Sequence, residues 1–175
     1  MKVYLIKNLN ENKTSWKESL INILVRDYQM DKKKIEFYNN EYGKPYLLNS
    51  KIYFNISHSG KLLAIGISSD EVGVDIELVQ ERKYQDDVVK RTFNEKEQEI
   101  YNGNKQVTYF YDVWTKKEAY VKLIGTGIRN MFKDLPIEYD EVIITKKIHY
   151  LDNDYYLSLA TNDKNERNNI EIIYE

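Results

Sequence analysis

The chain has 175 residues, 42% hydrophobic and 31% charged, which is the composition of a folded protein of one domain or two small ones. Its 26 basic residues against 28 acidic ones give a net charge of −2, so the composition predicts no nucleic-acid partner. The absence of cysteine excludes disulfides, thiolate zinc sites and cysteine nucleophiles. We expect neither a signal peptide nor a membrane span, and therefore a cytoplasmic protein.

The first half of the chain predicts strands around one helix. Residues 3–6 are typical of a short strand, and apolar residues recur every three or four positions over 16–28, after a capping pair at Thr14-Ser15. The elements expected next are a strand at 51–56, a turn at 57–60, a strand at 62–68, a turn at 69–71 and a strand at 72–78.

The second half repeats an order of helices followed by strands. Helices are predicted at 84–91, 95–101 and 107–124, strands at 141–150, 154–160 and 169–174, and a hairpin loop at 162–169. Because helices and strands do not strictly alternate, the pattern favours an α+β fold. The shared order suggests two similar subdomains, residues 1–78 and 79–175, joined near 79–83.

Two carboxylates recur in the segment Gly73-Val74-Asp75-Ile76-Glu77. In a strand, Asp75 and Glu77 point to the same face, ~7 Å apart, while the apolar residues point to the other. Such a pair could hold a hard cation such as Mg²⁺ through oxygen ligands. The alternative is an amphipathic strand with its polar face in water, and this segment taken alone favours that alternative.

A second candidate is the helical segment that runs from Trp114 to Lys122. Glu118 and Lys122 lie one turn apart on one face of the helix. An exposed ion pair is the commoner reason for this spacing. As a functional pair, they would offer a carboxylate to a metal or a nucleophile and a cation to a phosphate.

Two further segments contain potential phosphate ligands. In Ser57-His58-Ser59-Gly60, hydroxyls, an imidazole and turn amides could bind a phosphate, although a plain turn explains them equally well. Gly43-Lys44-Pro45 predicts a turn that leads into a strand. If that turn lines a cleft, Lys44 becomes a phosphate contact, and Arg26 late in the first helix is another candidate.

These segments together resemble the motif series of Sfp-type 4′-phosphopantetheinyl transferases. The resemblance rests on their order and spacing, closely over residues 20–132 and weakly in the final strands. The motifs are Gly43-Lys44-Pro45, Phe54 to Ser59, Gly73 to Glu77 and Trp114 to Lys122, with further similarity in Leu24-Val25-Arg26 and in Thr92 to Glu97.

The resemblance implies an enzyme that moves the phosphopantetheine group of coenzyme A to a serine of an apo acyl or peptidyl carrier protein and releases 3′,5′-ADP. Such proteins act in nonribosomal peptide, polyketide or fatty acid biosynthesis. The family fold implies a monomer of two similar α/β subdomains about a pseudo-twofold axis, with coenzyme A between them. Asp75, Glu77 and Glu118 then correspond to the Mg²⁺ ligands.

The resemblance also suggests a role for each remaining candidate. Glu118 is the expected general base, with Glu97 as a weaker candidate, and Lys122 is expected to contact the diphosphate and stabilise the leaving group. Ser57 and His58 correspond to contacts with the 3′-phosphate. Further coenzyme A contacts are expected from Arg26, Gly43, Lys44 and Pro45, and from Asp75 through the metal.

The sequence departs from the family at two places. Residues 10–17 are a shortened form of a basic stretch that reaches the 3′-phosphate, with Lys13 and Lys17 as candidate replacements, and Asn94 replaces a usual serine as a helix cap. One alternative function is a coenzyme A-binding module without transfer activity. Another is a serine hydrolase that uses Ser57 and His58, although no G-x-S-x-G elbow is present.

Overall fold

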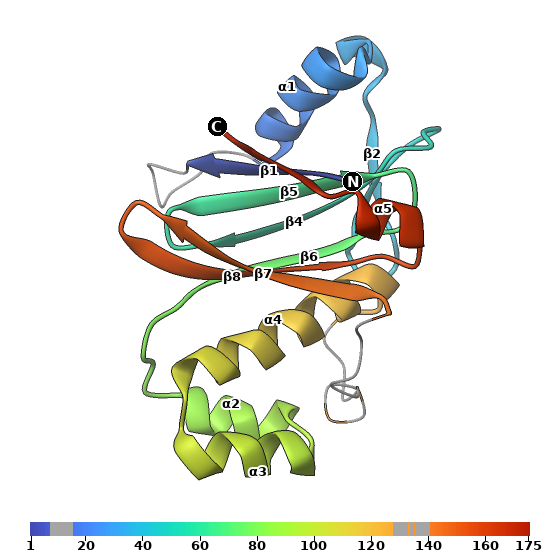
Figure 1. Ribbon diagram of the computed structural model, residues 1–175. Coiled ribbons are helices and arrows are strands. Elements are labelled where there is room, and N and C mark those ends of the chain that lie inside the picture. Colours follow the sequence, from blue (N-terminus) through green and yellow to red (C-terminus); the bar gives the residue numbers. More distant parts are fainter. Residues whose placement is uncertain (8–15, 128–132, 134, 136–140) are drawn as a thin grey trace.

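The computed structural model describes residues 1–7, 16–127, 133, 135 and 141–175 (Figure 1). The α+β fold class predicted from the sequence is confirmed. In chain order the elements are β1 (Lys2–Lys7), α1 (Trp16–Tyr28), the 3₁₀ turn η1 (Lys32–Lys34), β2 (Phe37–Asn39), β3 (Pro45–Leu47), β4 (Tyr53–Ser59), β5 (Leu62–Ser68), β6 (Gly73–Leu78), α2 (Gln85–Thr92), α3 (Glu95–Asn104), α4 (Val107–Ile124), β7 (Ile143–Tyr150), β8 (Asn153–Ala160), α5 (Lys164–Asn168) and β9 (Glu171–Tyr174). No helix of these residues is long and apolar enough to cross a membrane.

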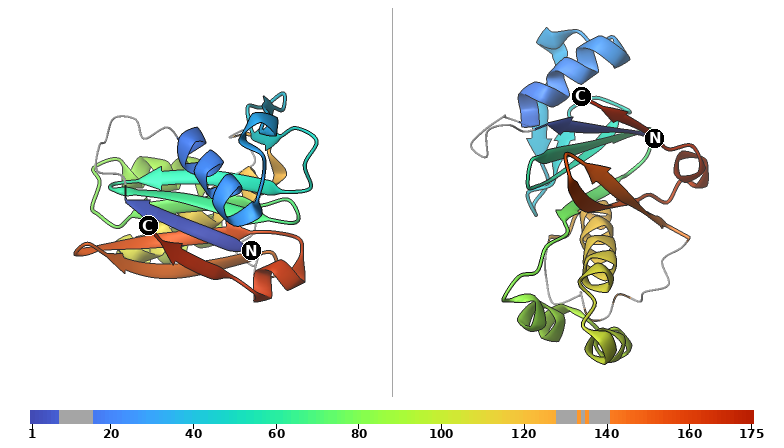
Figure 2. Two further views of the ribbon diagram at one scale, coloured as in Figure 1. Left: turned by 90° about the horizontal axis from the view of Figure 1, so that it is seen from above. Right: turned by 60° about the vertical axis from the view of Figure 1, so that its left-hand side comes forward.

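Two main sheets stack face to face, and a helix covers the outer face of each (Figures 1 and 2). The first sheet has the strand order β4-β5-β1-β9 and the second has the order β6-β8-β7, while β2 and β3 form a separate hairpin. Apolar side chains of β1, β5, β6 and β8 fill the space between the sheets. The outer face of the first sheet packs on α1, and that of the second packs on α4.

Each main sheet contains the same sequence of elements. In the first sheet β1 is followed by α1 and the antiparallel pair β4-β5, and in the second β6 is followed by α4 and the antiparallel pair β7-β8. The last strand, β9, returns to pair with β1 in parallel. The division into residues 1–78 and 79–175 stays a prediction, and the pairing of β6 with β8 argues for placing β6 with the second unit.

Two local predictions are wrong. Residues 57–59 are not a turn, because they continue β4 and pair with β5 as far as Ser59 opposite Leu62, so that the chain turns at Gly60 and Lys61. Residues 162–169 are not a hairpin loop, because they contain α5, whose first turn is capped by the side chain of Asp163. The strand that follows pairs with β1 rather than with β8, which requires the chain to cross from one sheet to the other.

Candidate active site

The acidic strand is confirmed as β6, and its alternation separates an apolar face from a polar face. Val74 and Ile76 are fully buried in the core between the sheets. Asp75 and Glu77 therefore point to the other side, toward α4. Asp75 is 4% exposed, so this polar face does not lie open to water as in an ordinary amphipathic strand.

A glycine allows α4 to lie directly on β6. A Cβ atom added at Gly73 would lie 1.9 Å from the backbone oxygen of Ala119, a distance that no real pair of atoms adopts. Only a residue without a side chain fits there. The helix backbone thus approaches the first residue of the strand, and Glu118 on the helix lies close to the carboxylates of the strand.

Side chains of β4 join the two sheets along β6. The Asn55 side chain accepts a hydrogen bond from the backbone amide of Val74 (2.9 Å), Ser57 Oγ donates to Asp75 Oδ1 (2.8 Å), and Ser59 Oγ donates to Glu77 Oε2 (2.8 Å). The strand period of two puts Asn55, Ser57 and Ser59 on one face of β4. These bonds fix the carboxylates and explain why residues 57–59 stay in the strand.

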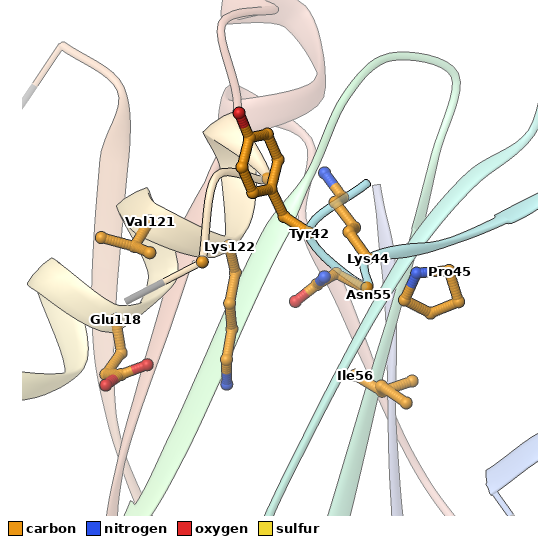
Figure 3. A pocket seen from close by; sticks show the side chains of 11 residues that line it. Tyr42, Lys44, Pro45, Asn55, Ile56, Glu118, Val121 and Lys122 are labelled. Carbon is orange, nitrogen blue, oxygen red and sulfur yellow. The ribbon is translucent and has the colours of Figure 1, made fainter. Parts of the chain in front are cut away.

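The catalytic candidates Glu118 and Lys122 lie on the face of α4 that approaches β4 and β6, as Figure 3 shows for both side chains. Lys122 Nζ donates to Asp75 Oδ1 at 2.7 Å and to Ser57 Oγ at 3.1 Å. The helix α4, the acidic strand β6 and the strand β4 therefore meet at the ammonium group of Lys122. The spacing also allowed an exposed ion pair between Glu118 and Lys122. Lys122 instead pairs with Asp75 of β6.

Burial raises the pKa of all three carboxyl groups, and Asp75 adds to the rise at Glu77 and Glu118. Burial raises the pKa of Glu118 to about 7, nearby Asp75 adds to the rise, and Lys122 opposes it. Burial also raises the pKa of Asp75, again opposed by Lys122. For Glu77 burial and Asp75 raise the pKa, while Ser59 and Arg82 lower it. A further cation at this place would stabilise the charged forms.

The donor set suits a hard dication. All three predicted ligands, Asp75, Glu77 and Glu118, are carboxylates, the ligand type that Mg²⁺ prefers. Asp75 Oδ2 is buried and accepts no hydrogen bond from the residues that the structure describes. Within those residues, however, no three such side chains already stand in a metal-ligand arrangement. The assignment of Asp75, Glu77 and Glu118 to a metal thus stays a prediction.

A cavity of about 260 Å³ opens beside this cluster. Figure 3 shows Glu118 and Lys122 of α4 on one side of it and Asn55 and Ile56 of β4 on the other. Of the residues predicted from the sequence, Gly43, Lys44, Pro45, Glu118 and Lys122 line it. The predicted turn that leads into a strand is confirmed, because the chain turns over residues 40–43, with Gly43 at φ +89°, and β3 begins at Pro45. Gly43, Lys44 and Pro45 all reach the cavity.

Six predicted residues do not line this cavity, and three of them, Ser57, Asp75 and Glu77, belong to the cluster beside it. The other three lie apart from that cluster. Arg26 is exposed on α1 and binds Asp27 and Glu175. His58 is exposed, and the strand alternation puts it on the face of β4 opposite to Ser57. Glu97 is fully buried, and its carboxylate binds Lys117 Nζ at 2.5 Å and the amide of Asn94 at 2.7 Å.

The predicted helix cap at Asn94, which replaces the usual serine of the family, is confirmed at the start of α3. Its side chain accepts from the amide of Glu97 while the Glu97 side chain accepts from the amide of Asn94, which is a complete capping box. The contribution of Glu97 that the structure shows is therefore to α3.

Thr14, Ser15 and Lys13 lie outside the described residues, and Lys17 Nζ lies over the rings of Trp16 and Phe37.

Sequence reasoning missed Asn55 and Ser59, which join the sheets, and Glu71, which binds Lys44. For the first two a signal was present, since polar residues alternate through an otherwise apolar strand. For Glu71 the sequence carried no signal, because its partner lies in a distant loop.

Comparison with known proteins agrees with the motif series. Residues 71–167 match the model of the 4′-phosphopantetheinyl transferase superfamily. The chain is 36% identical over 124 residues to the 4′-phosphopantetheinyl transferase gsp of Aneurinibacillus migulanus, covering 66% of this chain and 51% of the relative. It is 34% identical over 110 residues to Sfp of Bacillus subtilis, covering 61% and 48%, and 35% identical over 95 residues to AcpT of Salmonella typhi, covering 51% and 50%.

The chain belongs to the 4′-phosphopantetheinyl transferase superfamily, because the family model matches more than half of it. The relatives gsp and Sfp support the Sfp type predicted from the motifs. The chain spans about half the length of the curated relatives that it matches.

Proposed function

We propose that this chain transfers the 4′-phosphopantetheine group of coenzyme A to a serine hydroxyl of an apo acyl or peptidyl carrier protein. The observation that supports it best is the meeting of Asp75, Glu118 and Lys122, from a strand and a helix, beside the cavity of Gly43 to Pro45. The relatives gsp and Sfp are named as 4′-phosphopantetheinyl transferases, which agrees with this activity. A cytoplasmic monomer remains the expectation from the sequence.

In the proposed reaction the serine oxygen forms a bond to the β-phosphorus of coenzyme A. The bond from that phosphorus to the bridging oxygen breaks, and 3′,5′-ADP leaves with the bonding electrons. Glu118 accepts the serine proton, because it is a carboxylate that lines the cavity next to Lys122 and Asp75. Lys122 stabilises charge on the diphosphate, and catalysis rests mainly on positioning and electrostatics.

Asp75, Glu77 and Glu118 are the residues that would hold Mg²⁺. When bound, the ion would neutralise the diphosphate and help to orient it. Ser57 contributes by fixing Asp75, since its hydroxyl donates to that carboxylate. The geometry does not favour the contacts that the resemblance assigns to Arg26 and His58, because Arg26 binds Asp27 and Glu175 and His58 is exposed on the face of β4 opposite to Ser57.

The test is incubation of the purified chain with coenzyme A, Mg²⁺ and several apo carrier proteins. We expect the mass of at least one carrier to rise by one phosphopantetheine group, and a carrier with alanine in place of the acceptor serine to stay unchanged. If the chain binds coenzyme A in the presence of Mg²⁺ but modifies none of the carriers, the inactive binding module replaces this proposal. Esterase activity that persists without metal would favour the serine hydrolase.

A further inference from the structure

The C-terminal end of α4 is held by a loop from the first half of the chain. Asn40 Nδ2 donates to the backbone oxygen of Gly125 at 2.9 Å, and Lys44 Nζ donates to that of Leu123 at 3.0 Å. The last carbonyls of a helix have no partner within the helix, and a cation there also complements the helix dipole. Residues 40–44 therefore cap the helix that carries Glu118 and Lys122.

The other contacts of Lys44 lie at the start of β6. Its ammonium donates to Glu71 Oε2 at 2.6 Å and to the backbone oxygen of Val72 at 3.3 Å. Val72 directly precedes Gly73, the first residue of the acidic strand. Lys44 therefore connects the end of α4 to the start of β6, the two elements whose side chains form the candidate active site.

These contacts engage the whole ammonium group. A lysine offers three N–H donors, and Glu71, Val72 and Leu123 provide three acceptors. The Lys44 side chain is only 6% exposed, and burial lowers its pKa while Glu71 opposes the shift. A phosphate contact by Lys44, as the sequence suggested, would require the ammonium to break one of these bonds.

We propose that Lys44 and Glu71 are positioning residues, which together hold the end of α4 against the start of β6 and so set the place of Lys122 and Glu118 relative to Asp75. Leu123, which Lys44 binds, directly follows Lys122 in the helix. A displacement of reacting groups by about 1 Å can cost ~10²-fold in rate. This inference rests on the proposed transfer activity, and Glu71 itself does not line the cavity.

The test compares Lys44→Met, Glu71→Gln and the double variant in carrier modification. Methionine keeps an unbranched side chain, one atom shorter than that of lysine, and has no donor. We expect kcat to fall by about tenfold in each single variant and no further in the double variant, because both changes break one connection. The KM for coenzyme A should stay within about threefold, and the loss should be equal with dephospho-coenzyme A, which lacks the 3′-phosphate.

A direct phosphate contact predicts a different pattern. Lys44→Met would then raise the KM for coenzyme A, with less effect on dephospho-coenzyme A, and Glu71→Gln would not reproduce it. That result overturns the proposal. Matched controls are Glu41→Gln, exposed in the same loop, and Lys61→Met, exposed after β4, both of which should leave kcat unchanged.

Hydrogen exchange separates positioning from general loss of stability and needs no activity. The amide of Gly125 donates to Val121 O at 2.9 Å and reports on the end of α4, while that of Ile65 reports on the central strand β5. In Lys44→Met and Glu71→Gln, exchange at Gly125 should accelerate at least about tenfold more than at Ile65. Equal acceleration at both amides contradicts the proposal. If the wild-type chain transfers no phosphopantetheine group, the proposed function is refuted. The exchange result still decides the role of Lys44.

Discussion

Two of the lysine–carboxylate pairs of α4 lie on different faces of the helix. Lys117 Nζ is 2.5 Å from Glu97 Oε2, and the two side chains are 2% and 0% exposed. Lys122 Nζ is 2.7 Å from Asp75 Oδ1, with side chains 27% and 5% exposed. The chemistry of the pairs is nearly the same, so the difference between them comes from what surrounds each pair.

The Lys117–Glu97 pair, which we call the inner pair, is enclosed between α3 and α4. Lys117 Nζ also donates to the backbone oxygen of Thr92 and stands over the ring of Phe93, and Glu97 belongs to the capping box with Asn94. Nothing from solution reaches these groups without opening the fold. Such a pair contributes to stability and to the orientation of α3 on α4.

In the Lys122–Asp75 pair, the outer pair, Lys122 lines the cavity, and Asp75 raises the pKa of the neighbouring Glu77 and Glu118. Its lysine is partly exposed and lines the cavity, so an anion that enters the cavity can reach the ammonium. We expect access to solvent, together with an excess of negative charge, to make the outer pair functional and the inner pair structural.

The largest effect is expected from the acidic end of the outer pair. Removal of divalent ions with EDTA, or the substitution Asp75→Asn, should lower carrier modification by ~10³-fold or more. Added Mg²⁺ should restore the wild type and leave the variant inactive. The unfolding free energy of Asp75→Asn, measured in urea, should be maintained, because burial already disfavours the charged carboxylate. Full activity in EDTA would remove the metal role of Asp75, Glu77 and Glu118 together.

Glu97→Ala tests the inner pair. Loss of one partner of a buried pair, and of the capping box with it, should lower the unfolding free energy by ~3–5 kcal/mol in urea titrations. Activity per folded molecule should remain that of the wild type. Glu99→Ala, in an exposed position of the same helix, is the matched control and should change stability little. A stable Glu97→Ala protein without activity would reverse the comparison.

Glu118→Gln separates a base from a metal ligand. Glutamine keeps the size and one oxygen but removes the charge and the basicity. We expect kcat to fall by ~10²-fold and to stay low at saturating Mg²⁺, with coenzyme A binding nearly intact. If high Mg²⁺ restores Glu118→Gln while Glu97→Gln keeps a metal-resistant kcat defect, the base is Glu97.

The smallest effect is expected at an exposed pair, Arg26 with Asp27. Arg26 lowers the pKa of Asp27 from 3.8 to about 2. Their interaction therefore stabilises the folded state fully above pH 3.8, and this stabilisation is lost as the pH falls through about 2. In Arg26→Ala, an NMR titration should show the Asp27 pKa moving back toward 3.8. The KM for coenzyme A should not change, since Arg26 does not line the cavity. An increase in KM would support the nucleotide contact suggested by the motif series.

Much of the fold was predictable from the sequence because its signals are local. The apolar period and Gly125 predicted α4 to its last residue, and Gly125 indeed has the left-handed conformation of a helix end. The alternation of Gly73 to Glu77 predicted which side chains share a face. The end of β4 was misjudged because Ser57 and Ser59 resemble turn residues, whereas partners on β6 keep them in a strand.

The candidate site was predictable as a set of residue types and only partly as an arrangement. By itself the sequence determined the α+β class, most of the helices and strands, and the motif series that indicates the family, since these depend on neighbours along the chain. Only the tertiary structure decided that Lys122 binds Asp75, that Lys44 caps α4 and that Glu97 is enclosed. These partners are far apart in sequence, and burial and ion pairing between them depend on how the sheets and helices pack.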